Sequence, residues 1–179
     1  MSNKSLKADL PFDNPGEMEL RKKYPSMYQW DEYNIRSMIS EYIHAGIARF
    51  IEAQQFFFIA TANEFGHCDA SFRGTELSPE SGTFLPACKV INNKVLVFPD
   101  YSGNGLYNSL GNILRNPHIG MVFVDFERQS RARINGKATI KDVDKNILSI
   151  WPNAQAYIEV TVEQVYGNCP ARIPRMKYC

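Results

Sequence analysis

The chain has 179 residues, of which 44% are hydrophobic and 22% charged, and its formal net charge is +1. This composition predicts a globular domain with a sizeable core and extra residues at one end. The balanced charge gives no basic footprint for nucleic acid, and no apolar run reaches the length of a membrane span. The start, MSNKSLKADL, lacks a signal peptide's apolar core, so we expect a cytoplasmic protein with neither a nucleic-acid nor a membrane partner.

The cysteines and histidines do not predict a metal site. The four cysteines, at positions 68, 88, 169 and 179, form no C-x-x-C pair, and the three histidines are scattered. Zinc and iron–sulfur sites need closely spaced ligands. We therefore interpret the cysteines as reduced thiols, as is usual in a cytosolic protein.

Residues 1–46 are predicted to form an N-terminal extension that carries a helix. The first part, residues 1–30, contains scattered prolines and the basic run Arg21-Lys22-Lys23. From Asp31, a suitable N-cap, apolar residues recur at three- and four-residue steps as far as Ile51, which predicts an amphipathic helix. Gly46 is a point at which this helix could divide in two.

The remaining chain has the pattern of short strands. The run FFFIATA, residues 56–62, is nearly all apolar, which is typical of a strand covered on both faces. Asn92-Asn93 suits a two-residue hairpin turn. Further strands are expected near residues 69–72, 89–91, 94–98, 119–126, 132–140 and 156–166. With one helix among them, these strands predict a mainly β fold, a closed or nearly closed antiparallel barrel.

The stretch SGNGLYNSLGN, residues 102–112, is unusually rich in small and amide residues. We expect Pro99 to end the preceding strand and a helix to run from about Gly103 to Arg115 with an apolar stripe. That stripe comprises Leu106, Leu110, Ile113 and Leu114. Glycines and neutral donors at a helix start suit a phosphate or another anion. The alternative is a plain strand-to-helix turn capped by Ser102 or Asn104.

Other charged residues allow two interpretations each. Arg73, in DASFRG, follows a buried strand and either reaches a ligand in the barrel groove or lies on a surface edge. The tail NCPARIPRMKY is positively charged and either closes over an anionic ligand or is a solvated end. Asp69 and Asp100, taken as a carboxylate pair, are interpreted as solvated loop charge. Ser71 and Ser102 have no plausible histidine partner in the same motif, so no catalytic triad is predicted.

Several segments together resemble the pyridoxamine 5'-phosphate oxidase-like FMN-binding split-barrel family. They are FFFIATANEFGHCDASFRG, VFPDYSGNGLYNSLGNILRNPHIGMVFVDF, INGKA and YGNCPARIPR. The likeness is strongest to a branch with GNGxxNSLGN and a C-terminal NCP motif. The resemblance implies that residues 47–179 form a six-stranded antiparallel split β-barrel. It also implies a homodimer with FMN at the subunit interface.

The resemblance also assigns residues to the flavin. The flavin ring and ribityl chain would be lined by Ser71, Phe72, Arg73 and Gly74, with Pro99 and Asp100 at the strand end. The phosphate would be held by Ser102, Gly103 and Asn104, with Asn108 nearby. Arg172 and Arg175 would approach from the other subunit. No catalytic side chain is assigned.

One departure from the family bears on the substrate. The family's oxidases place an Arg-Lys pair on the FMN phosphate, where this chain has Ser102-Gly103-Asn104. Neutral donors bind phosphate more weakly than charged ones. The resemblance thus implies an FMN-dependent oxidoreductase whose substrate is not pyridoxamine phosphate, with a nicotinamide nucleotide as candidate electron donor. Two alternatives stay open: a flavin-binding storage, sensing or partner-binding module without turnover, and a barrel that binds haem or deazaflavin.

Overall fold

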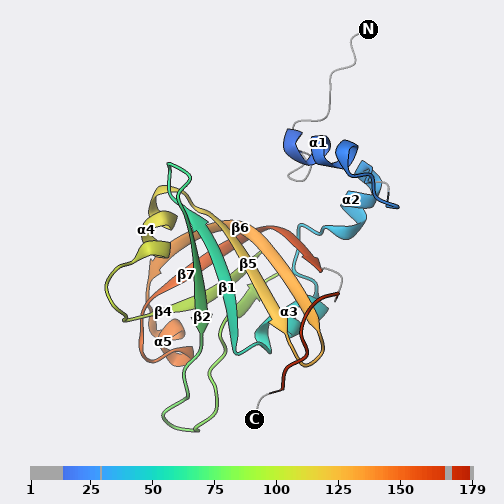
Figure 1. Cartoon of the computed structure of the whole chain (residues 1–179). Coiled ribbons are helices and arrows are strands. Elements are labelled where there is room, and N and C mark those ends of the chain that lie inside the picture. Colours follow the sequence, from blue (N-terminus) through green and yellow to red (C-terminus); the bar gives the residue numbers. More distant parts are fainter. Residues whose placement is uncertain (1–13, 29, 168–170, 178–179) are drawn as a thin grey trace. The chain divides into compact units, whose positions relative to one another are not determined.

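The computed structural model describes residues 14–28, 30–167 and 171–177. Its contacts divide the chain into two compact units, unit 1 (Met1–Ile39) and unit 2 (Ser40–Cys179). Most of the helices and strands of both units are labelled in Figure 1.

Unit 1 contains two short helices, α1 (Pro15–Lys23) and α2 (Glu32–Met38). A capping box begins α1, because Asn14 Oδ1 accepts from the Glu17 N–H at 3.0 Å and the Glu17 side chain accepts from the Asn14 N–H. The expected cap Asp31 begins α2 and accepts from the Asn34 N–H at 2.8 Å. No residue of α1 is buried, so packing within this unit contributes little to the stability of the helix.

The helix predicted from Asp31 to Ile51 is divided in two, as the sequence allowed, but the division is not at Gly46. Its second half forms a separate helix, α3 (Ala45–Glu52), and the break precedes Gly46, which lies inside α3. Two tertiary contacts extend the chain at the break: Ser40 forms a β-bridge with Val165, and the Ile43 N–H donates to Asn93 at 2.8 Å. These sheet contacts override the helical periodicity.

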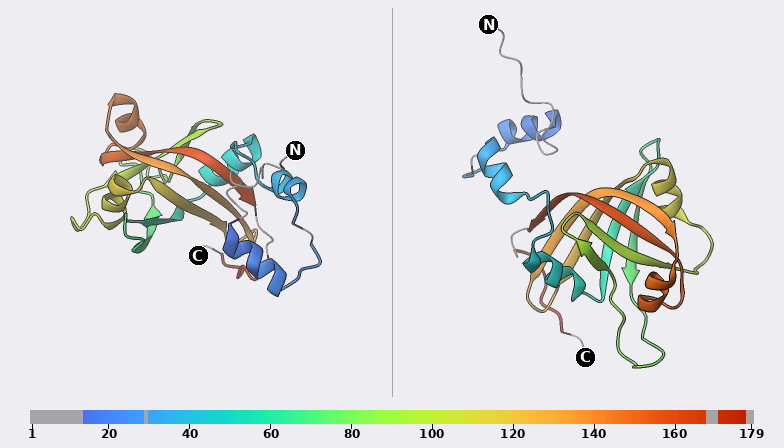
Figure 2. Two further views of the ribbon diagram at one scale, coloured as in Figure 1. Left: turned by 90° about the horizontal axis from the view of Figure 1, so that it is seen from above. Right: turned by 180° about the vertical axis from the view of Figure 1, so that it is seen from behind.

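Unit 2 is built on one antiparallel sheet of seven strands in the order β2-β1-β5-β6-β7-β4-β3. The strands are β1 (Phe56–Ala62), β2 (Cys68–Gly74), β3 (Lys89–Asn92), β4 (Val95–Tyr101), β5 (His118–Asp125), β6 (Ser130–Asp142) and β7 (Ala154–Gly167). The strand segments expected from the sequence pattern also number seven, whereas the family resemblance implied six strands. The long strands curl around the core (Figure 2). The mainly β split-barrel prediction is therefore confirmed, and the predicted hairpin joins β3 to β4, with its turn at Asn93-Lys94, one residue later than expected.

The core lies on the inner face of the curled sheet. Phe57, which is fully buried, stacks on Phe123 at 4.9 Å and meets Phe98 edge-on at 5.3 Å between ring centroids. The alternation predicted for residues 132–140 is confirmed from Ala132 to Ala138. By contrast, β1 is covered on one face only in the single chain, since Phe58 remains 41% exposed.

Two helices complete unit 2. The first, α4 (Asn108–Arg115), packs beside β1, β2 and β6, and the second, α5 (Lys145–Ile150), was not predicted. Asp144 caps α5 through the Ile147 N–H at 2.9 Å. Just after α5, the fully buried Trp151 donates its indole N–H to the Pro86 carbonyl at 2.7 Å. This bond fixes the β2–β3 connection to the sheet. Among the described residues, no helix is long and apolar enough to cross a membrane.

A glycine at the β6 bulge is required by packing. The register of β6 on β7 shifts between Asn135 and Gly136, and a Cβ at Gly136 would collide with the Thr161 carbonyl oxygen. We expect Gly136→Ala to lower the free energy of unfolding by about 1–3 kcal/mol in urea denaturation. Gly46→Ala is the control, because a Cβ there meets nothing within 4 Å and alanine favours a helix. A stable Gly136→Ala variant would contradict this account.

Candidate functional site

A polar cavity of about 250 Å³ lies between β2, the end of β4 and the loop that leads into α4. Its lining residues are Asp69, Ala70, Ser71, Arg73, Asp100, Tyr101, Gly103, Asn104, Gly105, Leu106, Tyr107, Asn108, Ser109 and Leu110. β2 is an edge strand, and β4 lies next to the opposite edge strand. The cavity is therefore at the split between the two ends of the curled sheet.

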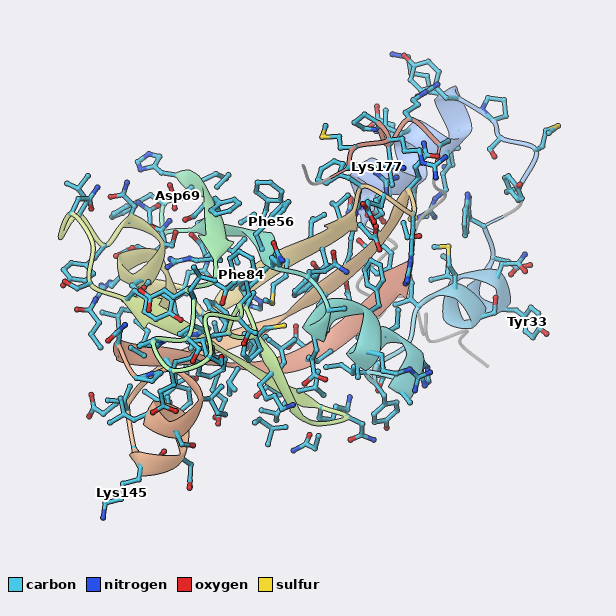
Figure 3. The ribbon with its side chains drawn as sticks, turned by 90° about the horizontal axis from the view of Figure 1, so that it is seen from below. Tyr33, Phe56, Asp69, Phe84, Lys145 and Lys177 are labelled. Carbon is cyan, nitrogen blue, oxygen red and sulfur yellow. The ribbon has the colours of Figure 1, made fainter. Side chains whose placement is uncertain are left out.

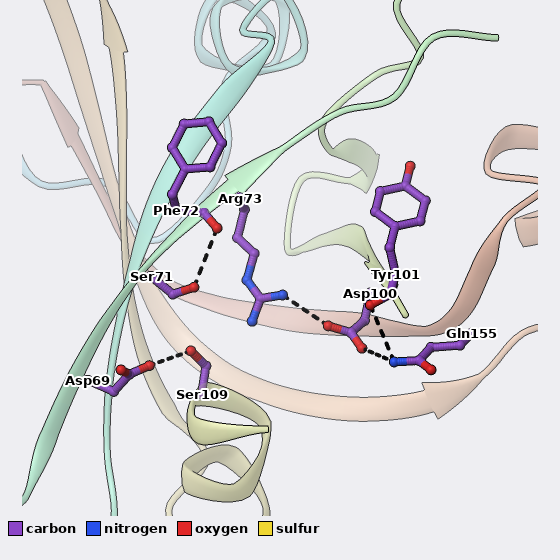
Figure 4. Close-up of polar contacts among 8 residues, drawn as sticks. All are labelled: Asp69, Ser71, Phe72, Arg73, Asp100, Tyr101, Ser109 and Gln155. Atoms are coloured by element: carbon purple, nitrogen blue, oxygen red, sulfur yellow. Dashed lines mark hydrogen bonds and ion pairs between the residues drawn. The ribbon is translucent and has the colours of Figure 1, made fainter. Parts of the chain in front are cut away.

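An ion pair crosses this split (Figure 4). Arg73 Nη1 of β2 donates to Asp100 Oδ1 of β4 at 2.9 Å, and the two side chains are only 19% and 6% exposed. The other oxygen, Asp100 Oδ2, accepts from Gln155 Nε2 at 2.9 Å. Of the two interpretations of Arg73, the structure supports a cavity position rather than a surface edge. The interpretation of Asp100 as solvated charge is wrong.

Two lining residues each have a buried polar atom without a partner among the described residues, Nε of Arg73 and the hydroxyl of Tyr101. Burial, and secondarily Glu76, raises the pKa of Tyr101 to about 12. The phenol therefore stays protonated at neutral pH. The described lining contains no histidine, lysine or cysteine, so its candidate proton acceptors are the carboxylates of Asp69 and Asp100, each of which already accepts a hydrogen bond from a protein group.

The helix at the cavity begins later than predicted. α4 starts at Asn108 instead of Gly103, and Tyr107, its N-cap, is in the left-handed region at φ 51° and provides no side-chain bond. Neither Ser102 nor Asn104 caps the helix, since Asn104 Oδ1 accepts from the Leu106 N–H at 3.0 Å within the loop. Within the described chain, the N–H groups of residues 108–110 have no acceptor. The uncapped N-terminus of α4 thus faces the cavity with free donors.

Two polar side chains of α4 are turned toward the sheet. Ser109 Oγ donates to Asp69 Oδ2 of β2 at 2.6 Å, and Asn112 Nδ2 donates to Thr61 Oγ1 of β1 at 3.1 Å. In the β1–β2 strand pair, Asp69 of β2 lies near one end and Phe56 of β1 lies at the opposite end (Figure 3). Asn112 therefore anchors the helix, and Asp69 is a cavity residue instead of solvated loop charge.

Two of the four residues expected in the apolar stripe of this helix are buried. Leu110 and Ile113 are buried, whereas Leu114 is 74% exposed and Leu106, which precedes the helix, is 69% exposed. The later start of the helix explains the difference at Leu106, because that residue belongs to the loop.

The structure brings half of the predicted site residues together. The cavity lining includes Ser71, Arg73, Asp100, Gly103, Asn104 and Asn108. Outside it are Phe72, Gly74, Pro99 and Ser102. Strand alternation explains Phe72, which points from the opposite face of β2 and is 59% exposed.

Pro99 was expected to end its strand, but β4 continues to Tyr101 and Pro99 pairs in register with Tyr157. β3 pairs with β4 only as far as Val97, so the proline's missing N–H interrupts no ladder.

The predicted arginines of the C-terminal tail lie elsewhere in the same chain. The tail runs along the β5–β6 turn, where the Ile173 carbonyl accepts from Gln129 Nε2 at 2.7 Å and the Met176 N–H donates to Phe126 at 3.3 Å. Arg172 and Arg175 are exposed on this segment. Their approach to the site of another subunit stays a prediction.

Reasoning from the sequence missed Asp69, Tyr101, Tyr107 and Leu110 as cavity residues, and Gln155 behind them, whereas Ser109 belongs to the neutral donors expected at the helix start. One signal was present: Asp69 shares the alternation of Ser71 and Arg73 and so had to share their face of β2. Gln155 gave no such signal, and neither did the bond of Ser109 to Asp69, because their partners are 55 and 40 residues away in the chain.

Comparison with known proteins identifies relatives of this fold. The family model described as pyridoxamine 5'-phosphate oxidase matches residues 43–169. HupZ of Group A Streptococcus is 18% identical, with a TM-score of 0.53 over 75% of this chain and 99% of its own. A candidate pyridoxamine 5'-phosphate oxidase of Lactobacillus delbrueckii is 15% identical, with a TM-score of 0.52 over 71% and 95%. At these identities the two structures show a shared fold. No curated protein matches the chain.

The ion pair across the split is expected to stabilise unit 2. Arg73→Ala leaves the buried Asp100 carboxylate without its cation, which we expect to cost about 3 kcal/mol of the free energy of unfolding in urea. Arg115→Ala is the matched control, because it removes an equally short pair, Arg115 Nε to Glu64 Oε1 at 2.9 Å, at an exposed position. The control should lose clearly less. Equal losses would show that burial of the pair contributes nothing.

Proposed function

The chain belongs to the pyridoxamine 5'-phosphate oxidase family, and on that premise we propose that it is an FMN-binding oxidoreductase whose flavin phosphate binds at the N-terminus of α4. The observation that carries the proposal is the uncapped start of α4, with the free N–H groups of residues 108–110 at a cavity. Such a helix start attracts anions through its free donors and its dipole. This position is a few residues beyond the Ser102-Gly103-Asn104 segment expected from the sequence.

The remaining lining suits the polar parts of a flavin. Arg73 has a buried Nε donor that has no partner among the described residues. Its guanidinium is held by Asp100, and Asp100 in turn accepts from Gln155. Ser71 and Asn108 add neutral hydrogen-bonding groups. When bound, FMN supplies the hydride chemistry, and these residues bind and orient it. Since no arginine–lysine pair stands at the helix start, we propose a substrate other than pyridoxamine phosphate, with a nicotinamide nucleotide as electron donor.

The cavity alone is small for a whole cofactor. Its volume of about 250 Å³ is below the ~300–1,000 Å³ typical of pockets that enclose a ligand. A second surface would complete the enclosure, and a second copy of the chain is our proposal for it. This site would lie at the interface of a homodimer, where Arg172 and Arg175 of one subunit could approach the flavin of the other.

An aromatic patch favours such a dimer. It comprises Phe56, Phe58 and Phe72 on the outer face of β1 and β2, with Phe56 stacked on Phe72 at 5.2 Å and Phe58 edge-on to Phe72 at 5.9 Å. Phe58 and Phe72 are 41% and 59% exposed. Exposed clusters of this kind mark interaction surfaces, and the apolar run of β1 is typical of a strand covered on both faces.

One observation supports a second candidate, a flavin-binding module without turnover. In the described lining, Tyr101 stays protonated, and the two carboxylates, Asp69 and Asp100, already accept hydrogen bonds from protein groups. Storage, sensing or partner binding would need only the binding site. The same fold could also hold haem or deazaflavin, and the absorption spectrum separates these from FMN.

The cofactor proposal is tested on the protein purified from cells. We expect a yellow protein with a flavin absorption spectrum, or one that acquires it when FMN is added. A colourless protein that takes up no FMN, or one with the Soret band of haem, would contradict the proposal. Stopped-flow mixing with NADH or NADPH then distinguishes the two candidates, because rapid bleaching of the flavin indicates an oxidoreductase and its absence favours the binding module.

The dimer is tested by light scattering, and we expect the mass of two 20.4 kDa chains. Phe58→Asp places a charge in the aromatic patch and should yield monomers. Phe65→Asp is the matched control, because Phe65 is 77% exposed in the β1–β2 turn, outside the patch. A monomeric wild type, or dissociation of both variants alike, would exclude this surface as the interface.

A further inference from the structure

We propose that Asp69 determines flavin specificity: its carboxylate at the start of α4 lowers the preference for phosphorylated flavin, so that the site accepts riboflavin alongside FMN. The inference rests on the proposed function and concerns which form of the flavin the site selects. The inference depends on the position of the Asp69 carboxylate. Asp69 is not among the residues that the family resemblance assigns to the flavin.

The geometry puts Asp69 where the phosphate would bind. Ser109 is the second residue of α4, and its hydroxyl donates to Asp69 Oδ2 at 2.6 Å. The bond crosses from the helix start to β2, with Asp69 on the cavity face of the strand. The helix start therefore already has an anion beside it, and a phosphate at the same N–H groups would meet that carboxylate.

The charges of the lining do not cancel this repulsion. The lining has one cation, Arg73, and two carboxylates, Asp69 and Asp100. Arg73 is paired with Asp100 at 2.9 Å. Asp69 has no ion-pair partner within the described chain, since its bond is to a neutral hydroxyl. The helix dipole contributes only about half a unit of positive charge, which does not offset a full carboxylate and a phosphate dianion together.

Riboflavin shares the ring and ribityl chain of FMN and lacks only the phosphate. Asp69 therefore penalises FMN but not riboflavin, for which a carboxylate at this position is an acceptor for the terminal hydroxyl. Like charges in a partly enclosed site repel strongly, because the effective dielectric constant there is far below that of water. The result is a site that discriminates weakly between the two flavins.

A purely structural role for Asp69 makes a different prediction. If the carboxylate only fastens α4 to β2, then breaking its bond to Ser109 should affect both flavins alike. Asp69→Asn removes the charge and keeps an acceptor oxygen for Ser109, whereas Ser109→Ala breaks the bond and keeps the charge. The two variants therefore separate the charge from the contact.

The experiment measures the dissociation constants of FMN and riboflavin by equilibrium dialysis for the wild type and both variants. We expect Asp69→Asn to raise the preference for FMN over riboflavin roughly tenfold, a change that corresponds to ~1.4 kcal/mol. Ser109→Ala should leave the preference close to that of the wild type. Circular dichroism checks that each variant is folded.

A further variant moves the charge the other way. Asn104→Asp adds a carboxylate to the cavity lining while keeping Oδ1 as acceptor for the Leu106 N–H, and it should lower the preference for FMN. An unchanged preference in Asp69→Asn, or an equal rise in Ser109→Ala, would overturn the inference while flavin binding itself stands. If the wild type binds neither flavin, the proposed function fails and the inference falls with it.

Discussion

A buried ion pair joins the two ends of the curled sheet. Arg73 is on the edge strand β2, Asp100 is on β4 near the opposite edge, and no backbone ladder connects these strands. The barrel is therefore closed at this place by side chains. The pair leaves room beside it, and that room is the cavity into which the uncapped end of α4 opens. The candidate site exists because the sheet does not close on itself.

The same arrangement determines what the site can bind. Asp100 uses both of its oxygens to hold Arg73 and Gln155, so the guanidinium is fixed while its Nε remains free. A fixed donor loses little conformational entropy when it binds a ligand. The helix start adds further donors, and Asp69 adds a negative charge beside them. The cavity thus combines donors for a polar ligand with a charge that limits how anionic that ligand can be.

Much of the fold followed from local patterns in the sequence. Alternation predicted β6, and the Asn92-Asn93 pair predicted the β3–β4 hairpin, because period and turn chemistry are local properties. The sequence did not predict where the break between α2 and α3 lies, because its position depends on Ser40 pairing with Val165, which is far along the chain. The late start of α4 was missed because Gly103 to Tyr107 form a loop stabilised by its own turns. In the site, the partners of Asp69 and Asp100 come from other strands and helices, which no spacing rule reveals.

Trp151 and Trp30, the two tryptophans of the chain, happen to report on different units. Trp151 is fully buried in unit 2 with its indole N–H bonded to Pro86, whereas Trp30 in unit 1 is 38% exposed. An indole in an apolar interior emits at shorter wavelength than one in contact with water. The intrinsic emission of the protein therefore contains two components, and the loss of the blue one on denaturation follows the unfolding of the barrel separately from that of the N-terminal helices.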